Sequence, residues 1–111
     1  MQPDFMDAQF NLGICLHYLE QFTEAIVCFD GIILQHPEAV QVLNAKGVSL
    51  YHADDYQAAL VVFKQALAMN QQHPEIYNNL GLALHKLNQF EEAINHYNQA
   101  ISINPEYADA Y

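Results

Sequence analysis

The apolar residues of this 111-residue chain recur with the period of an α-helix. One helical face in residues 77–84 holds four residues at i, i+3, i+4 and i+7, namely Tyr77, Leu80, Gly81 and Leu84. After the polar break "KLNQ", a second face of this kind runs through Phe90, Ala93, Ile94, Tyr97 and Ile101. A short break between two amphipathic helices predicts an antiparallel hairpin, and no segment alternates with the period of a strand. The pattern therefore predicts an all-α protein.

The hairpin pattern repeats three times. Gly13, Gly47 and Gly81 stand 34 residues apart. Four further classes keep this spacing: Leu16, Leu50 and Leu84; Phe22, Tyr56 and Phe90; Ala25, Ala59 and Ala93; Phe29, Phe63 and Tyr97. Glycine lowers the stability of a helix interior by about 0.5–1 kcal/mol relative to alanine, so its recurrence needs a reason. We interpret the glycines as sites of close helix packing, with Gly81 facing Ala93.

A helix–turn–helix unit of this period resembles the tetratricopeptide repeat family. The third unit resembles it most, through Tyr77, Leu80-Gly81, Leu84, Phe90, "EEA" ending at Ala93, Tyr97, Ala100 and Pro105. The resemblance implies a right-handed α-solenoid of antiparallel helix hairpins, with three repeats, six helices and the start of a seventh. Residues 1–111 are then a single domain with repeats at 6–39, 40–73 and 74–107, and residues 108–111 open a truncated fourth repeat.

Charge and cysteine content narrow the range of partners. The 13 acidic residues outnumber the 3 lysines, there is no arginine, and the formal net charge is −10. This charge argues against binding to nucleic acid phosphates or to an anionic membrane. The apolar runs are too short to span a membrane, and there is no signal peptide pattern. We interpret Cys15 and Cys28 as buried reduced thiols, which favours a reducing compartment such as the cytoplasm.

The motifs of common enzymes are missing from the sequence. It has no glycine-rich phosphate loop, no His-Glu-x-x-His and no Gly-x-Ser-x-Gly. The histidines lack the spacing of metal ligands, and none accompanies a cysteine in a zinc pattern. The sequence therefore predicts no catalytic residues, no metal site and no cofactor.

The family resemblance implies a concave surface, lined by the first helix of each repeat, that binds a peptide or a partner helix. The matching positions are Phe10, Asn11, Ile14, His17, Tyr18, Asn44, Val48, Tyr51, His52, Glu75, Asn78, Asn79, Leu82, His85 and Lys86. Equivalent positions should form two rows, one of His17, Tyr51 and His85 and one of Asn44 and Asn78. Ligand contact by the first row would make binding depend on pH between about 5.5 and 7.5.

The chemistry of this surface indicates the class of ligand. Some chaperone-binding relatives grip an acidic C-terminal carboxylate with a clamp of lysines, arginine and asparagines. The matching positions in this chain are Phe10, Ile14, Ala45 and Asn79, so the clamp is essentially absent. We therefore expect a neutral, aromatic or basic peptide, whose association with an acidic protein is electrostatically favoured if it is basic.

The C-terminal end supports a second function class. Arrays of this family usually close with an extra solvating helix, which this sequence lacks. We expect an open apolar end formed by Ile94, Tyr97, Ile101, Tyr107 and Tyr111, which would drive homo-oligomerisation. A truncated piece of a longer protein, whose next repeat supplies the cover, explains the same feature. The two interpretations are compatible, and the choice between a peptide-binding adaptor and a self-assembly module stays open.

Overall fold

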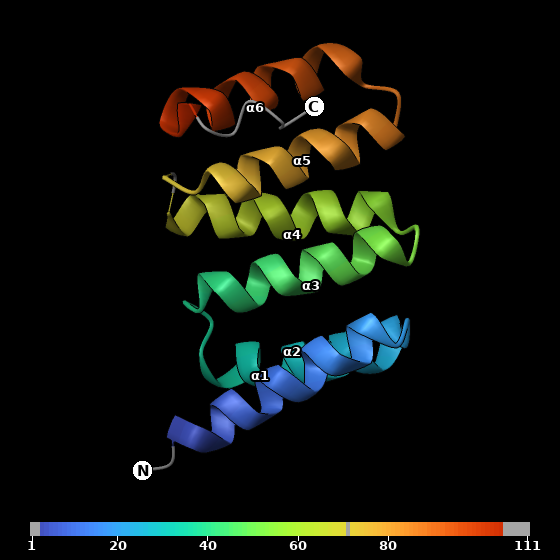
Figure 1. Ribbon diagram of the computed structural model, residues 1–111, viewed down its shortest axis with the longest axis vertical. Helices are drawn as coiled ribbons and strands as arrows, with labels where there is room; N and C mark the ends of the chain where they lie inside the picture. Colours follow the sequence, from blue (N-terminus) through green and yellow to red (C-terminus); the bar gives the residue numbers. More distant parts are fainter. Residues whose placement is uncertain (1–2, 71, 106–111) are drawn as a thin grey trace.

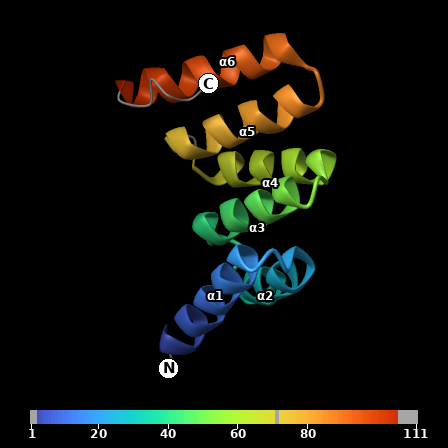
Figure 2. The same ribbon diagram turned by 45° about the vertical axis from the view of Figure 1, so that its right-hand side comes forward.

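The computed structural model describes residues 3–70 and 72–105, and these residues form a stack of helix hairpins (Figure 1). The helices in chain order are α1 (Pro3–Tyr18), α2 (Phe22–Gln35), α3 (Val40–His52), α4 (Tyr56–Met69), α5 (Pro74–Lys86) and α6 (Phe90–Ile103). Each helix packs against the next one in the sequence, and α1 and α6 lie at opposite ends of the stack (Figures 1 and 2). The predicted all-α solenoid is confirmed for the described residues.

The three hairpin turns share one backbone conformation. Their central residues, Glu20, Asp54 and Asn88, have φ values of 63°, 68° and 63°, in the left-handed region that non-glycine residues rarely adopt. The amide following each one donates to a carbonyl five residues earlier, as from Gln21 to Leu16 at 2.9 Å. This bond satisfies a free carbonyl at the end of the first helix, as in a Schellman motif. The same turn therefore recurs at each predicted polar break.

Helix ends agree with the local chemistry of the sequence. Asp55 caps α4, where its side chain accepts a hydrogen bond from the Ala58 amide at 3.3 Å. Pro74 is the first residue of α5, where a missing N–H leaves no helical hydrogen bond unmade. The helices α2 and α6 end shortly before Pro37 and Pro105, as expected from the inability of proline to continue a helix.

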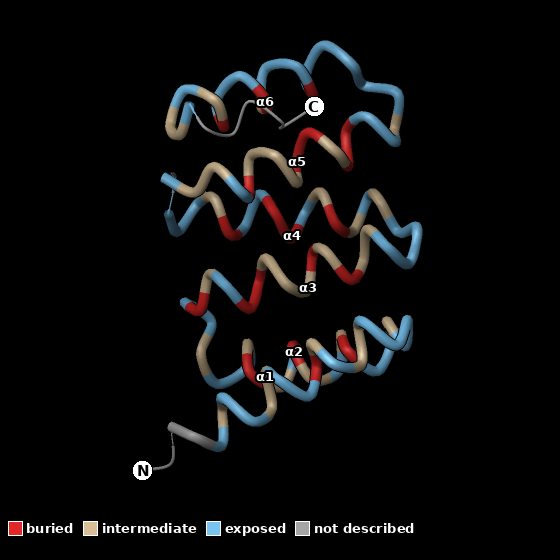
Figure 3. The backbone as a smooth tube through the Cα atoms, in the orientation of Figure 1, coloured by how far each residue is buried: buried red, intermediate tan, exposed pale blue. Residues whose placement is uncertain are grey.

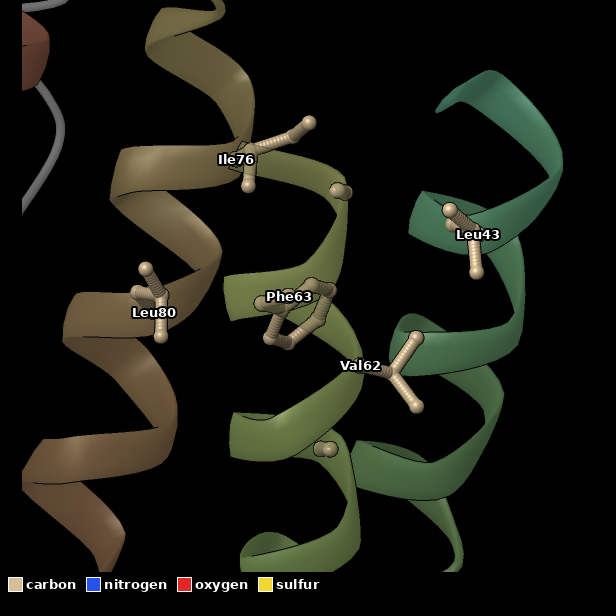
Figure 4. Close-up of a cluster of buried hydrophobic side chains, with 7 residues drawn as sticks. Leu43, Val62, Phe63, Ile76 and Leu80 are labelled. Atoms are coloured by element: carbon tan, nitrogen blue, oxygen red, sulfur yellow. The ribbon is translucent and has the colours of Figure 1, made fainter. Parts of the chain in front are cut away.

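The core is distributed along the stack, because each group of buried side chains joins consecutive helices (Figure 3). The central group brings Phe63 and Val62 of α4 against Leu43 of α3 and against Ile76 and Leu80 of α5 (Figure 4). Contacts of this kind reach only the neighbouring repeat, so the stability of the fold is close to a sum of repeat and junction contributions.

The recurring glycines are packing positions, as predicted, but they face aromatic rings and not the alanines. A Cβ atom on Gly47 would lie 2.7 and 2.8 Å from Cδ1 and Cζ of Phe63. Gly13 meets Phe29 in the same way, and Gly81 meets Tyr97. Since carbon atoms in van der Waals contact need about 3.5–4.0 Å, only glycine leaves room for these rings.

Two further expectations need correction or comment. Cys15 is exposed and Cys28 is half-buried, so the prediction that both thiols are buried is wrong. The start of a seventh helix, at residues 108–111, lies outside the described residues, and the repeat boundaries and the single domain stay predictions. Among the residues described, no helix has both the length and the apolar character needed to cross a bilayer.

Candidate functional site

A groove of about 310 Å³ opens between α1 and α3, with the start of α5 at its edge. Most of the residues predicted for the concave face of the first two repeats line it, together with Glu75 of the third, and those from the first two are Phe10, Ile14, His17, Tyr18, Asn44 and Val48. Sequence reasoning assigned no ligand contact to four further lining residues, namely Phe29, Gln41, Ala45 and Ser49. We call this set the concave groove.

The concave groove has an apolar floor and a polar edge. The Phe10 ring packs on the buried Phe29 ring with centroids 5.8 Å apart, which holds the floor in place. Asn44 and Glu75 add an amide and a carboxylate at the edge. An amide side chain both donates and accepts hydrogen bonds, as recognition of a peptide backbone requires.

His17 joins α1 to α3 at one end of the concave groove. Its Nδ1 lies 2.9 Å from the Oγ atom of Ser49, a hydroxyl that is fully buried and therefore needs a partner. The imidazole also contacts the His52 ring, with centroids 5.2 Å apart. Burial lowers the pKa of His17 below its usual 6.5, and the charge of His52 lowers it further. The neutral imidazole is therefore the stable form at neutral pH.

A second, smaller hollow of about 120 Å³ continues the concave groove toward α5. Five predicted residues line it together with Phe63, and those are Val48, Tyr51, His52, Asn79 and Leu82. Val48 belongs to both hollows, and Asn79 Nδ2 donates to Asn44 Oδ1 at 2.9 Å. This bond between α5 and α3 makes one continuous surface of the two hollows.

Four predicted residues lie apart from these hollows. Asn11 and Lys86 are exposed, and Asn78 is half-buried with a buried Oδ1 that has no hydrogen-bond partner among the described residues. The hydrogen bond of Asn44 is made with Asn79, and the row of Asn44 and Asn78 stays a prediction. His85 lines a different cavity and packs on Phe90 at 5.4 Å, so the predicted row of His17, Tyr51 and His85 is interrupted.

That third cavity, of about 430 Å³, lies on the α6 end of the stack. Its lining is almost wholly apolar and consists of His85, Phe90, Ala93, Ile94, Tyr97 and Asn98. Ile94 is 56% exposed, whereas Tyr97 is only 5% exposed because its ring packs on Gly81. Ile101 is half-buried. Tyr107 and Tyr111, also predicted for this open end, lie outside the described residues.

No lysine is among the residues that line the concave groove or the adjoining hollow. Lys46 of α3 pairs with Asp30 of α2 at 2.7 Å, with its side chain one-quarter exposed. The other lysines, Lys64 and Lys86, are not among the residues lining the two hollows.

Within the described part of the chain, no group of three or more histidine, cysteine, aspartate or glutamate residues is placed to hold a metal ion.

Comparison with protein families explains the periodic architecture. Two tetratricopeptide repeat profiles match residues 18–63 and 74–107, and a further TPR repeat profile matches residues 47–88. The chain belongs to the tetratricopeptide repeat family. Its repeats therefore form a protein–protein interaction scaffold, and such domains are non-catalytic.

Solved structures of tetratricopeptide repeat domains have the same fold. The first TPR of Spaghetti (RPAP3), bound to the HSP90 peptide SRMEEVD, matches 95% of this chain and 83% of its own with a TM-score of 0.90 and 19% identity. The first TPR domain of human RPAP3 gives the same values. A crystal structure of MamA has a TM-score of 0.89 and 24% identity, covering 98% of this chain and 64% of that one. No curated protein matches the sequence significantly.

Proposed function

We propose that the concave groove and the adjoining hollow bind an extended peptide or a helix of a partner protein that is neutral, aromatic or basic. The observation that carries this proposal is the continuous surface formed by an apolar floor and a polar edge. Phe10, Ile14 and Val48 offer contacts to apolar side chains, and Asn44 offers an amide to a peptide backbone. The whole domain, repeats 6–39, 40–73 and 74–107, serves to hold these helices in register.

The charge of the groove favours this class of ligand over an acidic tail. The described residues that line the concave groove include Glu75, and neither the groove nor the adjoining hollow is lined by a lysine or an arginine. The RPAP3 domain was solved with SRMEEVD, a peptide with three acidic side chains. In this chain such a peptide would meet a carboxylate and a protein of net charge −10, so binding would be opposed over the range of the field.

A pair of peptides tests the proposal directly. Fluorescent SRMEEVD and its counterpart SRMKKVK would be titrated with the protein at low and high salt. We expect the basic peptide to bind more tightly, and its affinity to fall with salt. Preference for the acidic peptide would overturn the assignment of ligand class.

Charge reversal at the groove edge provides the matched control. Glu75 is exposed, so Glu75→Lys should leave the fold intact and weaken binding of the basic peptide several-fold. Glu92→Lys makes the same charge change on α6, outside the lining residues of the two hollows, and should have a smaller effect. Equal effects of the two variants would show that net charge, and not this groove, determines binding.

The cavity on α6 supports self-assembly as a second candidate function. Phe90 and Ile94 are 51% and 56% exposed beside an almost wholly apolar cavity, and such surfaces commonly mark interfaces. The two functions use separate surfaces, so one chain can perform both.

A cytoplasmic location is consistent with the free thiols of Cys15 and Cys28.

A further inference from the structure

At each end of the stack, a helix exposes a face that the equivalent helices of the other repeats bury. On α1 the exposed Ala8 stands one repeat before Val42 and two before Ile76, and both of these are 0% exposed. Leu12 is 54% exposed, whereas its equivalents are the half-buried Lys46 on α3 and Leu80 on α5, which is 0% exposed. The α1 face of Ala8, Leu12 and Cys15 is therefore the face that α3 and α5 press against the preceding repeat.

At the other end of the stack, α6 exposes the face that the next repeat covers on α2 and α4. Phe90 and Ile94 are exposed, but their equivalents are half-buried in both earlier repeats: Phe22 and Tyr56 for Phe90, and Ile26 and Leu60 for Ile94. In those repeats the first helix of the next hairpin lies over the second helix (Figures 1 and 2). The same register positions are therefore half-buried on α2 and α4 and exposed on α6.

The junction between α4 and α5 shows how the two faces fit. Ile76 and Leu80 of α5 pack on Phe63 of α4 (Figure 4). Leu60 packs at the margin of the same cluster. By the repeat register, Leu12 corresponds to Leu80 and Ile94 to Leu60. Tyr97 on α6 corresponds to Phe63. The exposed faces of α1 and α6 are thus the two halves of a junction that the chain already forms internally.

We infer that the α6 cavity receives the α1 face of a second copy of this chain, so that copies stack head to tail and continue the solenoid. A second copy is the occupant because this chain itself carries the matching half, in the same register and with the same apolar character. The contact joins two different surfaces, so it is heterologous and leaves a free half at each end of the assembly. It rests on the self-assembly function proposed for the α6 cavity and is independent of ligand binding in the concave groove.

The net charge of the chain makes this assembly sensitive to salt. Each copy carries a formal charge of −10, so two copies repel each other over the range of the electrostatic field. The contact residues Leu12, Phe90 and Ile94 are apolar, and burial of their side chains does not depend on charge pairing. Added salt screens the repulsion, and we therefore expect the average mass to rise with ionic strength.

The test measures molar mass by size-exclusion chromatography with light scattering, at rising protein and salt concentration. We expect a mass of 12.6 kDa in dilute low-salt buffer and a progressive increase beyond it. Ala8→Lys blocks the α1 face, because both equivalents of Ala8 are 0% exposed, and Ile94→Lys blocks the α6 face, so each variant alone should stay monomeric. Val61→Lys is the matched control, because Val61 is 56% exposed, as is Ile94, but lies outside both faces.

Mixing the two blocked variants gives the decisive result. Each retains the half that the other lacks, so an equimolar mixture should form a dimer that grows no further. A wild-type chain that stays monomeric would overturn the inference and leave a following repeat of a longer chain as the cover of α6. Loss of assembly in Ile94→Lys but not in Ala8→Lys would also overturn it, since α6 would then pair with α6. A mixture that stays monomeric would exclude the head-to-tail contact.

Discussion

Substitution of Gly47 by alanine tests the packing between helix and aromatic ring. A Cβ atom at this position on α3 would lie 2.7 and 2.8 Å from two carbon atoms of the Phe63 ring. The ring cannot easily move away, because Phe63 is only 1% exposed and is held by Val62 and Leu80 in the central cluster (Figure 4). The added methyl group must therefore displace one of the helices or strain the ring.

The expected magnitude follows from two opposing effects. Alanine is favoured over glycine in a helix interior by about 1 kcal/mol. Overpacking of a filled core costs about 1–3 kcal/mol. We therefore expect Gly47→Ala to lower the free energy of unfolding by about 1 kcal/mol, and the melting temperature by roughly 4 °C for a domain of this size.

Gly31 provides a matched control in the same fold. A Cβ atom there would approach only the Nε2 end of the flexible Gln9 side chain, at 2.7 Å. Gln9 can turn aside at the loss of a 3.3 Å hydrogen bond to the Cys28 carbonyl. The helix preference of alanine should then dominate, and Gly31→Ala should stabilise the protein by up to about 0.5–1 kcal/mol.

The assay is urea and thermal unfolding followed by circular dichroism, with a double-mutant cycle. Phe63→Leu removes the ring that clashes, so Gly47→Ala should be tolerated better in that background. We expect a coupling energy of about 0.5–3 kcal/mol between the two substitutions. If Gly47→Ala stabilises the protein as Gly31→Ala does, or if the coupling is zero, then the glycine is not required by the ring.

Three further changes test individual contacts. Asp55→Ala removes the side-chain cap of α4 and should cost about 0.5–2 kcal/mol in urea unfolding, whereas Gln89→Ala at the uncapped equivalent position should be nearly neutral. Glu20→Gly relieves a left-handed backbone with φ of 63° and should raise stability by about 0.5–1 kcal/mol in the same assay, and a loss would contradict the strain. The pKa of His17 in the folded protein is lower than the usual 6.5 of histidine, so just below pH 6.5 the unfolded chain binds more protons than the folded one. Stability should therefore fall as the pH drops below 6.5. His17→Gln should flatten this part of the pH profile, and an unchanged profile would exclude His17 as its source.

Much of the fold was predictable from the sequence because it rests on local regularity. The helical period of apolar residues determines which face of each helix is buried, and the polar breaks determine where the chain reverses. The recurrence of glycine at positions 13, 47 and 81 identified positions of close packing, although the partner predicted for Gly81 was Ala93 and the structure shows Tyr97. The predicted residues of the concave groove came from the resemblance to the tetratricopeptide repeat family, because the helical period by itself does not say which exposed face binds a partner.

Tertiary structure decided which residues meet across that surface. The 34-residue register predicted that Asn44 and Asn78 form a row, but Asn44 bonds to Asn79. It also predicted a row of His17, Tyr51 and His85, and the structure shows that His85 lines the α6 cavity. The burial of Cys15 was wrong for a related reason, since an end helix lacks the neighbour that covers the same face in later repeats.

The sequence by itself determined the helices, their pairing into hairpins and the inward stripe of each, because these depend on residues within one turn or one repeat. The offset of each hairpin against the next depends on side chains from three helices that fill one space together, as Phe63 does between α3, α4 and α5. Such packing is jointly determined and has no local signature. The shape of the concave groove, the His17–Ser49 contact and the exposed half at α1 are therefore properties that only the tertiary structure decided.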